Sequence, residues 1–142
     1  MNKYFLIVIC GFVAWVAPAR SQSQTQNEER EQAVRVVGTM RTLNTAEVAY
    51  KYSNASQRFG SKDEITEFLR TEGKDSPPLM DIENPAPYEI DIVTTADGSH
   101  YSITIKPAPD KDTHISPCGF AAFSDDTGVI YTGRALGCED GK

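Results

Sequence analysis

An α+β fold is what this sequence predicts, and three observations point to it. Residues 33–50 carry apolar side chains at helical spacing, residues 88–94 and 101–105 alternate apolar and polar side chains, and turn signals follow at 97–98 and 125–128. An antiparallel sheet with one apolar face needs a cover. Only the helix over 33–50, about 27 Å long at ~1.5 Å per residue, is long enough. We therefore expect a long N-terminal helix packed against a four-stranded antiparallel sheet, with one short extra helix.

The first nineteen residues read as a signal peptide. Lys3 provides the positive charge, an apolar run covers Tyr4–Ala17, and Ala17 and Ala19 stand where a signal peptidase expects small residues. The run is shorter than the ~20 residues that a membrane-spanning helix needs, so a retained anchor is the lesser alternative. Residues 1–19 thus predict a secreted or periplasmic protein with no membrane span after cleavage.

A polar leader, residues 20–32, precedes the domain over 33–142. The leader has no apolar periodicity and reads as a solvated segment or a frayed first helical turn. The apolar side of the helix after it consists of Ala33, Val36, Val37, Met40, Leu43, Val48 and Tyr50. Asn44 lies near the centre of this side and Glu47 beside it. Because a buried amide needs partners, we expect Asn44 to bond backbone groups of the covering element and to be structural.

A second helix is predicted by a capping box, with Ser61 as the cap and Glu64 three residues later. Ile65, Phe68 and Leu69 would share one face, and Gly73 would end the helix. Between the helices, Asn54-Ala55-Ser56 matches a glycosylation triplet, a pattern that is common by chance. After the second helix, the proline-rich residues 76–87 predict an extended connector.

The remaining elements are strands joined by tight turns. Asp97-Gly98 predicts a hairpin between 88–94 and 101–105. Residues 119–124 and 129–133 flank a second turn, in which Gly128 is available for positive φ. The chain order is thus helix, short helix and two antiparallel hairpins.

Charge and cysteine content narrow the function classes. The formal net charge is −6, so the surface should repel phosphate backbones, and nucleic acid is not an expected partner. Cys118 and Cys138 remain after signal cleavage, and in an exported protein such a pair predicts a disulfide. It would close a loop of about 21 residues and stabilise the fold by roughly 3 kcal/mol.

Motifs for catalysis are lacking: the sequence has no Gly-x-Ser-x-Gly elbow, glycine-rich phosphate loop or His-Glu-x-x-His helix. We therefore predict no enzyme, no catalytic or metal site and no cofactor. His100 and His114 read as solvated turn residues. The acidic loops 110–114 and 125–126 leave one alternative, a small exported module that binds a ligand or Ca²⁺ through aspartate oxygens.

Two segments resemble a known family. The stretch "AVRVVGTMRTLNTAEVAYKY", residues 33–52, resembles the soluble half of the N-terminal helix in bacterial type IV pilin-like proteins and pseudopilins. The stretch "FAAFSDDTGVIYTG", residues 120–133, resembles the closing hairpin of those proteins. The resemblance implies a sheet packed on the helix, and a C-terminal disulfide loop in the place that Cys118 and Cys138 occupy.

The N-terminus departs from that family. Pilins begin with a prepilin peptidase site and a long apolar helix half that forms the filament core, whereas this chain has a short signal segment followed by "SQSQTQNEEREQ". The chain thus looks like a pilin head released without its polymerising half. The resemblance implies a secreted, non-enzymatic module that interacts with protein partners, in association with a secretion or pilus apparatus.

Overall fold

A computed structural model describes residues 20–72, 78, 80–108 and 119–134 of the chain. Helix α1 covers Arg20–Ser53 and helix α2 covers Lys62–Thr71. The strands are β1 (Tyr88–Thr94), β2 (Tyr101–Pro107), β3 (Phe120–Asp125) and β4 (Ile130–Arg134). They form one antiparallel sheet in the order β1-β2-β3-β4. The predicted α+β architecture is confirmed.

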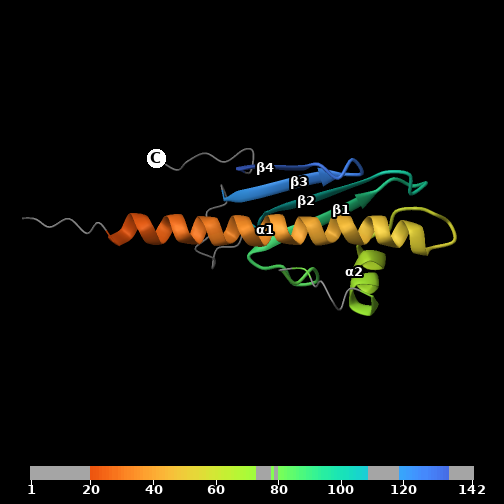
Figure 1. The fold of residues 1–142 in the computed structure, drawn as a ribbon, viewed down its shortest axis with the longest axis horizontal. Coiled ribbons are helices and arrows are strands. Elements are labelled where there is room, and N and C mark those ends of the chain that lie inside the picture. The colour runs from red at the N-terminus through yellow and green to blue at the C-terminus, as the bar shows by residue number, and fades with distance from the viewer. Residues whose placement is uncertain (1–19, 73–77, 79, 109–118, 135–142) are drawn as a thin grey trace, which may run out of the picture.

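The long helix is the axis of the molecule. In Figure 1 the sheet lies along one side of α1, and α2 lies near its C-terminal end on another side. The N-terminal turns of α1 extend past the strands. Among the described residues, no helix combines the length and the apolar character needed to cross a membrane.

The polar leader is helical. The helix α1 runs without interruption across residues 20–32 and into the segment predicted to be the first helix. Residues 26–31 are all exposed, as expected for a solvated segment, and the first fully buried residue is Val36. The expected leader is thus an extension of the core helix rather than an irregular segment.

The inward face of α1 is rotated from the predicted one. Val36, Met40 and Leu43 are fully buried as expected, but Glu47 is also 0% exposed, whereas Val48 is 45% exposed. Val48 lies about 120° around the helix axis from Val36 at ~100° per residue. The prediction that Val48 faces the sheet was wrong. The cause is tertiary, because a backbone donor of the following loop meets Glu47 and lets its carboxyl group enter the core.

Alternation in the strands has the predicted phase. Tyr88, Ile90 and Ile92 of β1 are buried, and so are Tyr101, Ile103 and Ile105 of β2. Ile90 pairs with Ile105, and Ile92 pairs with Ile103, which places these side chains side by side on the inner face of the sheet. A continuous apolar layer is the main stabilising contact between sheet and helix. The buried apolar residues are Val36, Met40, Leu43, Ala46, Phe59, Ile65, Met80, Ile82, Tyr88, Ile90, Ile92, Tyr101, Ile103, Ile105 and Ala122.

Both predicted tight turns are present. Gly98 has φ +67° and Gly128 has φ +73°, the left-handed region that favours glycine. At Gly98 a second constraint applies, since a Cβ would stand 2.6 Å from Cβ of Arg58. The loop after α1 therefore packs directly on the first hairpin turn.

The second helix begins as predicted. Ser61 and Glu64 form a reciprocal capping box, and Ile65 is buried. The helix ends at Thr71 with Glu72 as its C-cap, and Gly73 lies outside the described residues. In the described part of the proline-rich connector there is no helix or strand, as expected. Its Met80 and Ile82 join the core, which the sequence analysis did not anticipate.

Candidate functional site

The predicted disulfide cannot be placed, because Cys118 and Cys138 both lie outside the described residues. Phe120 and Arg134 are paired at the open end of the β3–β4 hairpin. The cysteines are thus two and four residues beyond a paired position, on the two sides of one hairpin. Their bridge stays a prediction.

Asn44 is buried between the helix and the sheet, at 9% exposure. Its Nδ2 donates to Ser124 Oγ at 2.8 Å, and its Oδ1 accepts from the Tyr101 hydroxyl at 3.1 Å. Ser124 Oγ in turn donates to the Val129 carbonyl at 3.0 Å. The expected burial is present, but the expected backbone partners are wrong. Both direct partners are side chains on the inner face of the sheet, which ties α1 to β2 and β3.

Burial of this cluster also affects the Tyr101 phenol. Desolvation raises the pKa of Tyr101 to about 12, and the negative charges of Glu47, Asp126 and Asp125 add to the effect. The phenol therefore stays protonated at neutral pH and remains a donor to Asn44. The Asn44 cluster has the chemistry of a fixed structural contact.

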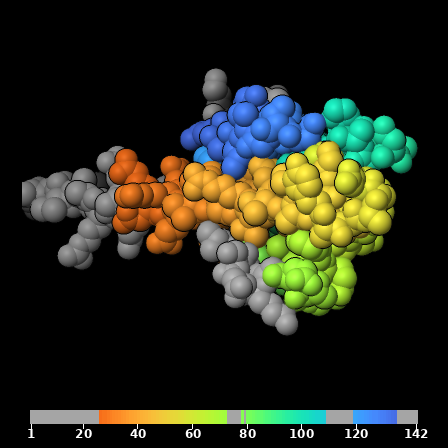
Figure 2. All heavy atoms as spheres, turned by 45° about the vertical axis from the view of Figure 1, so that its right-hand side comes forward, coloured from red at the N-terminus to blue at the C-terminus, as the bar shows by residue number. Residues whose placement is uncertain are grey.

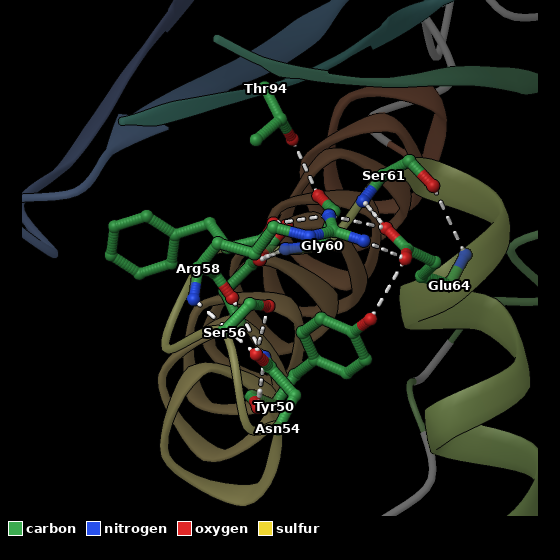
Figure 3. Close-up of polar contacts among 10 residues, drawn as sticks. Tyr50, Asn54, Ser56, Arg58, Gly60, Ser61, Glu64 and Thr94 are labelled. Carbon is green, nitrogen blue, oxygen red and sulfur yellow. Dashed lines mark hydrogen bonds and ion pairs between the residues drawn. The ribbon is translucent and has the colours of Figure 1, made fainter. Parts of the chain in front are cut away.

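The densest polar cluster of the described residues joins the C-terminal end of α1 to the start of α2. We call it the helix junction and define it as residues 54–61 with Glu47, Tyr50, Glu64 and Thr94. Figure 3 shows Tyr50, Arg58 and Ser61 converging on Glu64. Tyr50 Oη donates to Glu64 Oε1 at 2.9 Å, and Ser61 N donates to Glu64 Oε2 at 2.8 Å. The Arg58 guanidinium donates to both oxygens of the same carboxylate.

Glu64 is anionic throughout the neutral range. The hydrogen bond from Arg58, followed by the bond from the Ser61 backbone, lowers the pKa of Glu64 to about 2. Charge-assisted, two-pronged contacts of this kind hold an arginine fork in one geometry. Glu64 is thus both the capping residue of α2 and the anchor of the loop before it.

Asn54 organises the turn after α1. Its Nδ2 donates to the Tyr50 carbonyl at 2.8 Å and to the Arg58 carbonyl at 2.9 Å. Its Oδ1 accepts from Ser56 Oγ at 2.6 Å. A glycan on Nδ2 would replace one of the two donating hydrogens. The Asn54-Ala55-Ser56 triplet is therefore explained by its role in the turn.

Gly60 is the centre of the helix junction. Its N–H donates to Glu47 Oε2 at 2.9 Å, and its carbonyl accepts from Thr94 Oγ1 of β1. A Cβ at this position would stand 2.7 Å from Ile65 Cδ1 and 3.2 Å from Tyr50 Cδ1. The site therefore accepts only glycine without rearrangement, and it connects α1, α2 and β1 at one residue.

Two buried polar atoms on α1 have no hydrogen-bond partner among the described residues. They are Thr39 Oγ1 and Glu47 Oε1, both on fully buried side chains. Such atoms are rare in folded proteins, and each asks for a physical explanation. In the sequence, Glu47 reads as a polar residue beside the apolar side of the helix, but its spacing from Val36, Met40 and Leu43 is a signal that it points inward.

The acidic loops are only partly described. Loop 110–114, with His114, lies outside the described residues. Asp125 Oδ1 accepts from the Thr127 backbone at 3.0 Å and from its hydroxyl at 2.6 Å, as turn aspartates do. Asp126 Oδ2 lies 2.8 Å from His100 Nδ1, so His100 bridges the two hairpin turns rather than standing alone in solvent. In the part of the chain that the structure describes, no three His, Cys, Asp or Glu side chains gather closely enough to hold a metal ion.

The surface offers two features for contact with other molecules. Figure 2 shows the N-terminal turns of α1 projecting from the other coloured elements. On the outer face of the sheet, Phe123 of β3 pairs with Tyr131 of β4, with their ring centroids 6.3 Å apart. Both rings are exposed.

Comparisons of the chain with protein-family models, with curated proteins and with solved structures found no match.

Proposed function

We propose that the chain is an exported, non-enzymatic, pilin-like module that binds other proteins through the exposed N-terminal part of α1, in association with a secretion or pilus apparatus. We call residues 20–35 the helical arm. The proposal rests on the resemblance of residues 33–52 and 120–133 to pilin-like proteins and on the shape of the described fold.

The observation that carries the proposal is the helical arm itself. Helix α1 has 34 residues, and its first fully buried side chain is Val36. About 24 Å of helix, at ~1.5 Å per residue, therefore precedes the core. Residues 20–32 carry no large apolar side chain, and a helical segment of this kind gains little from packing and is marginal in water by itself. We therefore infer that the helical arm is a binding surface for another molecule.

The composition of the arm indicates the kind of partner. Residues 26–31 are exposed and include Glu28, Glu29, Arg30 and Glu31, with glutamine and asparagine beside them. Charges of both signs and amides favour a polar protein surface, whereas a membrane interior would require apolar side chains. Val34, at 58% exposure, is the one large apolar side chain of the described arm, and we expect it to lie at the centre of the contact with the partner.

Deletion of residues 20–32 tests the proposal. The shortened chain, exported behind the same signal segment, should fold with a melting temperature close to that of the full chain. The deletion removes the long 3.4 Å hydrogen bond from Tyr88 Oη to Gln32 Oε1 but leaves the buried residues from Val36 onward in place. Culture medium and envelope fractions are then separated by sedimentation. The full chain should sediment with surface filaments or secretion complexes, and the shortened chain should stay in the supernatant.

Equal distribution of the two chains would contradict the role of the arm. If both stay in the supernatant of a culture that assembles filaments or secretion complexes, the association itself is contradicted. A variant with the exposed turn residue Asp97 replaced by Asn serves as the control, because it changes a charge without touching the arm. It should distribute as the full chain does.

A further inference from the structure

Glu47 is a carboxyl group in the core of this fold. It is 0% exposed, and only one of its oxygens is bonded, by Gly60 N–H to Oε2 at 2.9 Å. Oε1 has no partner among the described residues. A buried carboxylate costs far more than a buried carboxylic acid unless a cation or several donors compensate it.

No cation compensates it from α1 or from the loop that follows. Lys51, one turn further along α1, holds its ammonium 4.1 Å from the centroid of the Phe59 ring. The Arg58 guanidinium of the loop is engaged by Glu64. Tyr50, whose phenol is near enough to feel the charge of Glu47, donates its hydroxyl to Glu64 as well. No described salt bridge involves Glu47.

The elements packed against this region bring no described cation into a salt bridge with Glu47. From α2 comes the carboxylate of Glu64, while Lys62 donates its ammonium to the Ile90 carbonyl at 2.8 Å. From β2 comes the phenol of Tyr101, and beyond it lie Asp125 and the Asp126–His100 pair. The field at Glu47 is therefore set by negative groups and by burial.

These surroundings raise the pKa of Glu47 from 4.5 to about 7. Desolvation is the largest cause, the Gly60 N–H opposes it, and the negative charge of Glu64 adds to it. The shift agrees in direction with the geometry, since a fully buried acid with one unbonded oxygen favours its neutral form.

We propose that Glu47 is a proton-controlled lock of the helix junction: as an uncharged carboxylic acid it stays buried and leaves the loop 54–61 closed against α1, and as a carboxylate it is driven toward water and loosens that loop and the start of α2. Gly60 is the point of transmission. The glycine bonds to Glu47 through its N–H and to Thr94 through its carbonyl, and Ile65 of α2 packs so close that an added Cβ would stand 2.7 Å from its Cδ1. Exposing the charged carboxylate to water requires this glycine to leave its place.

The sign of the pH effect follows from the raised pKa. Between pH 4.5 and about 7 the folded chain binds the Glu47 proton more tightly than the unfolded chain does, so stability falls as pH rises. The unfolding equilibrium constant should rise by up to about tenfold per pH unit in this window and then level off. Glu64 acts in the opposite direction and in another window, since its contribution is lost only as pH falls from 4.5 toward about 2.

Three chains test the lock: the parent, Glu47→Gln, and Glu29→Gln as a matched control on an exposed carboxylate of the same helix. Denaturant unfolding is measured at half-unit intervals from pH 5 to 8. The parent and Glu29→Gln should lose stability as pH rises, and Glu47→Gln should lose clearly less. Any other group that titrates in this range is common to the three chains and cancels. Parallel profiles for all three chains would overturn the proposal.

A second measurement applies to the parent chain alone and does not depend on the folding of a variant. In amide NMR spectra, the Gly60 N–H should titrate with a midpoint near 7, because its acceptor is the ionising group. Its exchange protection should fall across the same range more than that of Ile103, which lies in the centre of the sheet. A Gly60 midpoint below about 5.5, or protection that changes equally at both residues, would overturn the lock.

Discussion

At the scale of single residues, the mainly apolar core of this protein also contains a few polar side chains on the inward side of α1. Asn44, Glu47 and Thr39 are all buried on the inward side of α1. The amide nitrogen and the amide oxygen of Asn44 each bond to a side chain of the sheet, whereas Glu47 and Thr39 each keep an oxygen without a partner among the described residues. Asn44 therefore fixes the sheet against α1, whereas Glu47 and Thr39 each keep an oxygen that could still accept a hydrogen bond.

Asn44 provides a direct prediction. Replacing it with Leu removes the bonds to Ser124 and Tyr101 and leaves their hydroxyls buried without these partners. The expected loss of stability is about 1–3 kcal/mol. Thermal and denaturant unfolding of Asn44→Leu would measure it.

The control is Thr45→Leu, one position along the same helix and exposed. Its change should stay within about 0.5 kcal/mol. If Asn44→Leu were as stable as the parent chain, the cluster would add nothing, and the position of α1 on the sheet would have to rest on apolar contacts alone.

At the scale of elements, local sequence signals were sufficient to predict those features whose hydrogen bonds join residues close together in the chain. The capping box predicted the start of α2, and the two Gly turns predicted both hairpins. These features depend on neighbours within a few residues. The orientation of α1 could not be predicted this way, because it depends on the hydrogen bond from Gly60 N–H to Glu47, two residues that are thirteen positions apart in the chain.

The β3–β4 hairpin is the element that the predicted disulfide would close. Cys118 and Cys138 flank the paired positions Phe120 and Arg134. Replacing both cysteines with Ser should reduce stability by about 2–4 kcal/mol, because the bridge restricts the unfolded chain. Since β4 is exposed along most of its length and packs weakly by itself, the loss should be greatest at this hairpin.

Denaturation midpoints of the parent and the double variant, with and without reductant, measure the effect. Reductant should lower the midpoint of the parent and leave that of the double variant unchanged. Equal midpoints for the oxidised parent and the double variant would show that no stabilising bridge forms.

At the scale of the whole molecule, the periodicity of the apolar residues predicted the architecture. The contacts that the sequence did not predict are all between residues brought together by the tertiary fold. Met80 and Ile82 stand in a proline-rich stretch without period, yet both are buried. The pairing of His100 with Asp126 joins two turns that are 26 residues apart. Contacts of this kind exist only once the sheet has formed, so a pattern read along the chain does not contain them.

Helix α1 is long enough to belong both to the core and to the helical arm. Its C-terminal part holds the sheet through Val36, Met40 and Leu43, and its N-terminal part extends beyond the core. One continuous helix transmits the position of the arm rigidly to the domain. This arrangement would let a bound partner sit at a fixed distance from the sheet.

Photo-crosslinking from the helical arm tests the central claim most directly. A crosslinking amino acid is placed at Glu29 of the arm and, as a control, at Asp97 of the first hairpin turn; both positions are exposed. The chains are expressed in the organism that produces the protein and irradiated in place. We predict discrete, reproducible adducts with an envelope or filament protein from position 29 and none of the same size from position 97. Identical adduct patterns from both positions, or no adduct from position 29, would contradict the assignment of the arm as the binding surface.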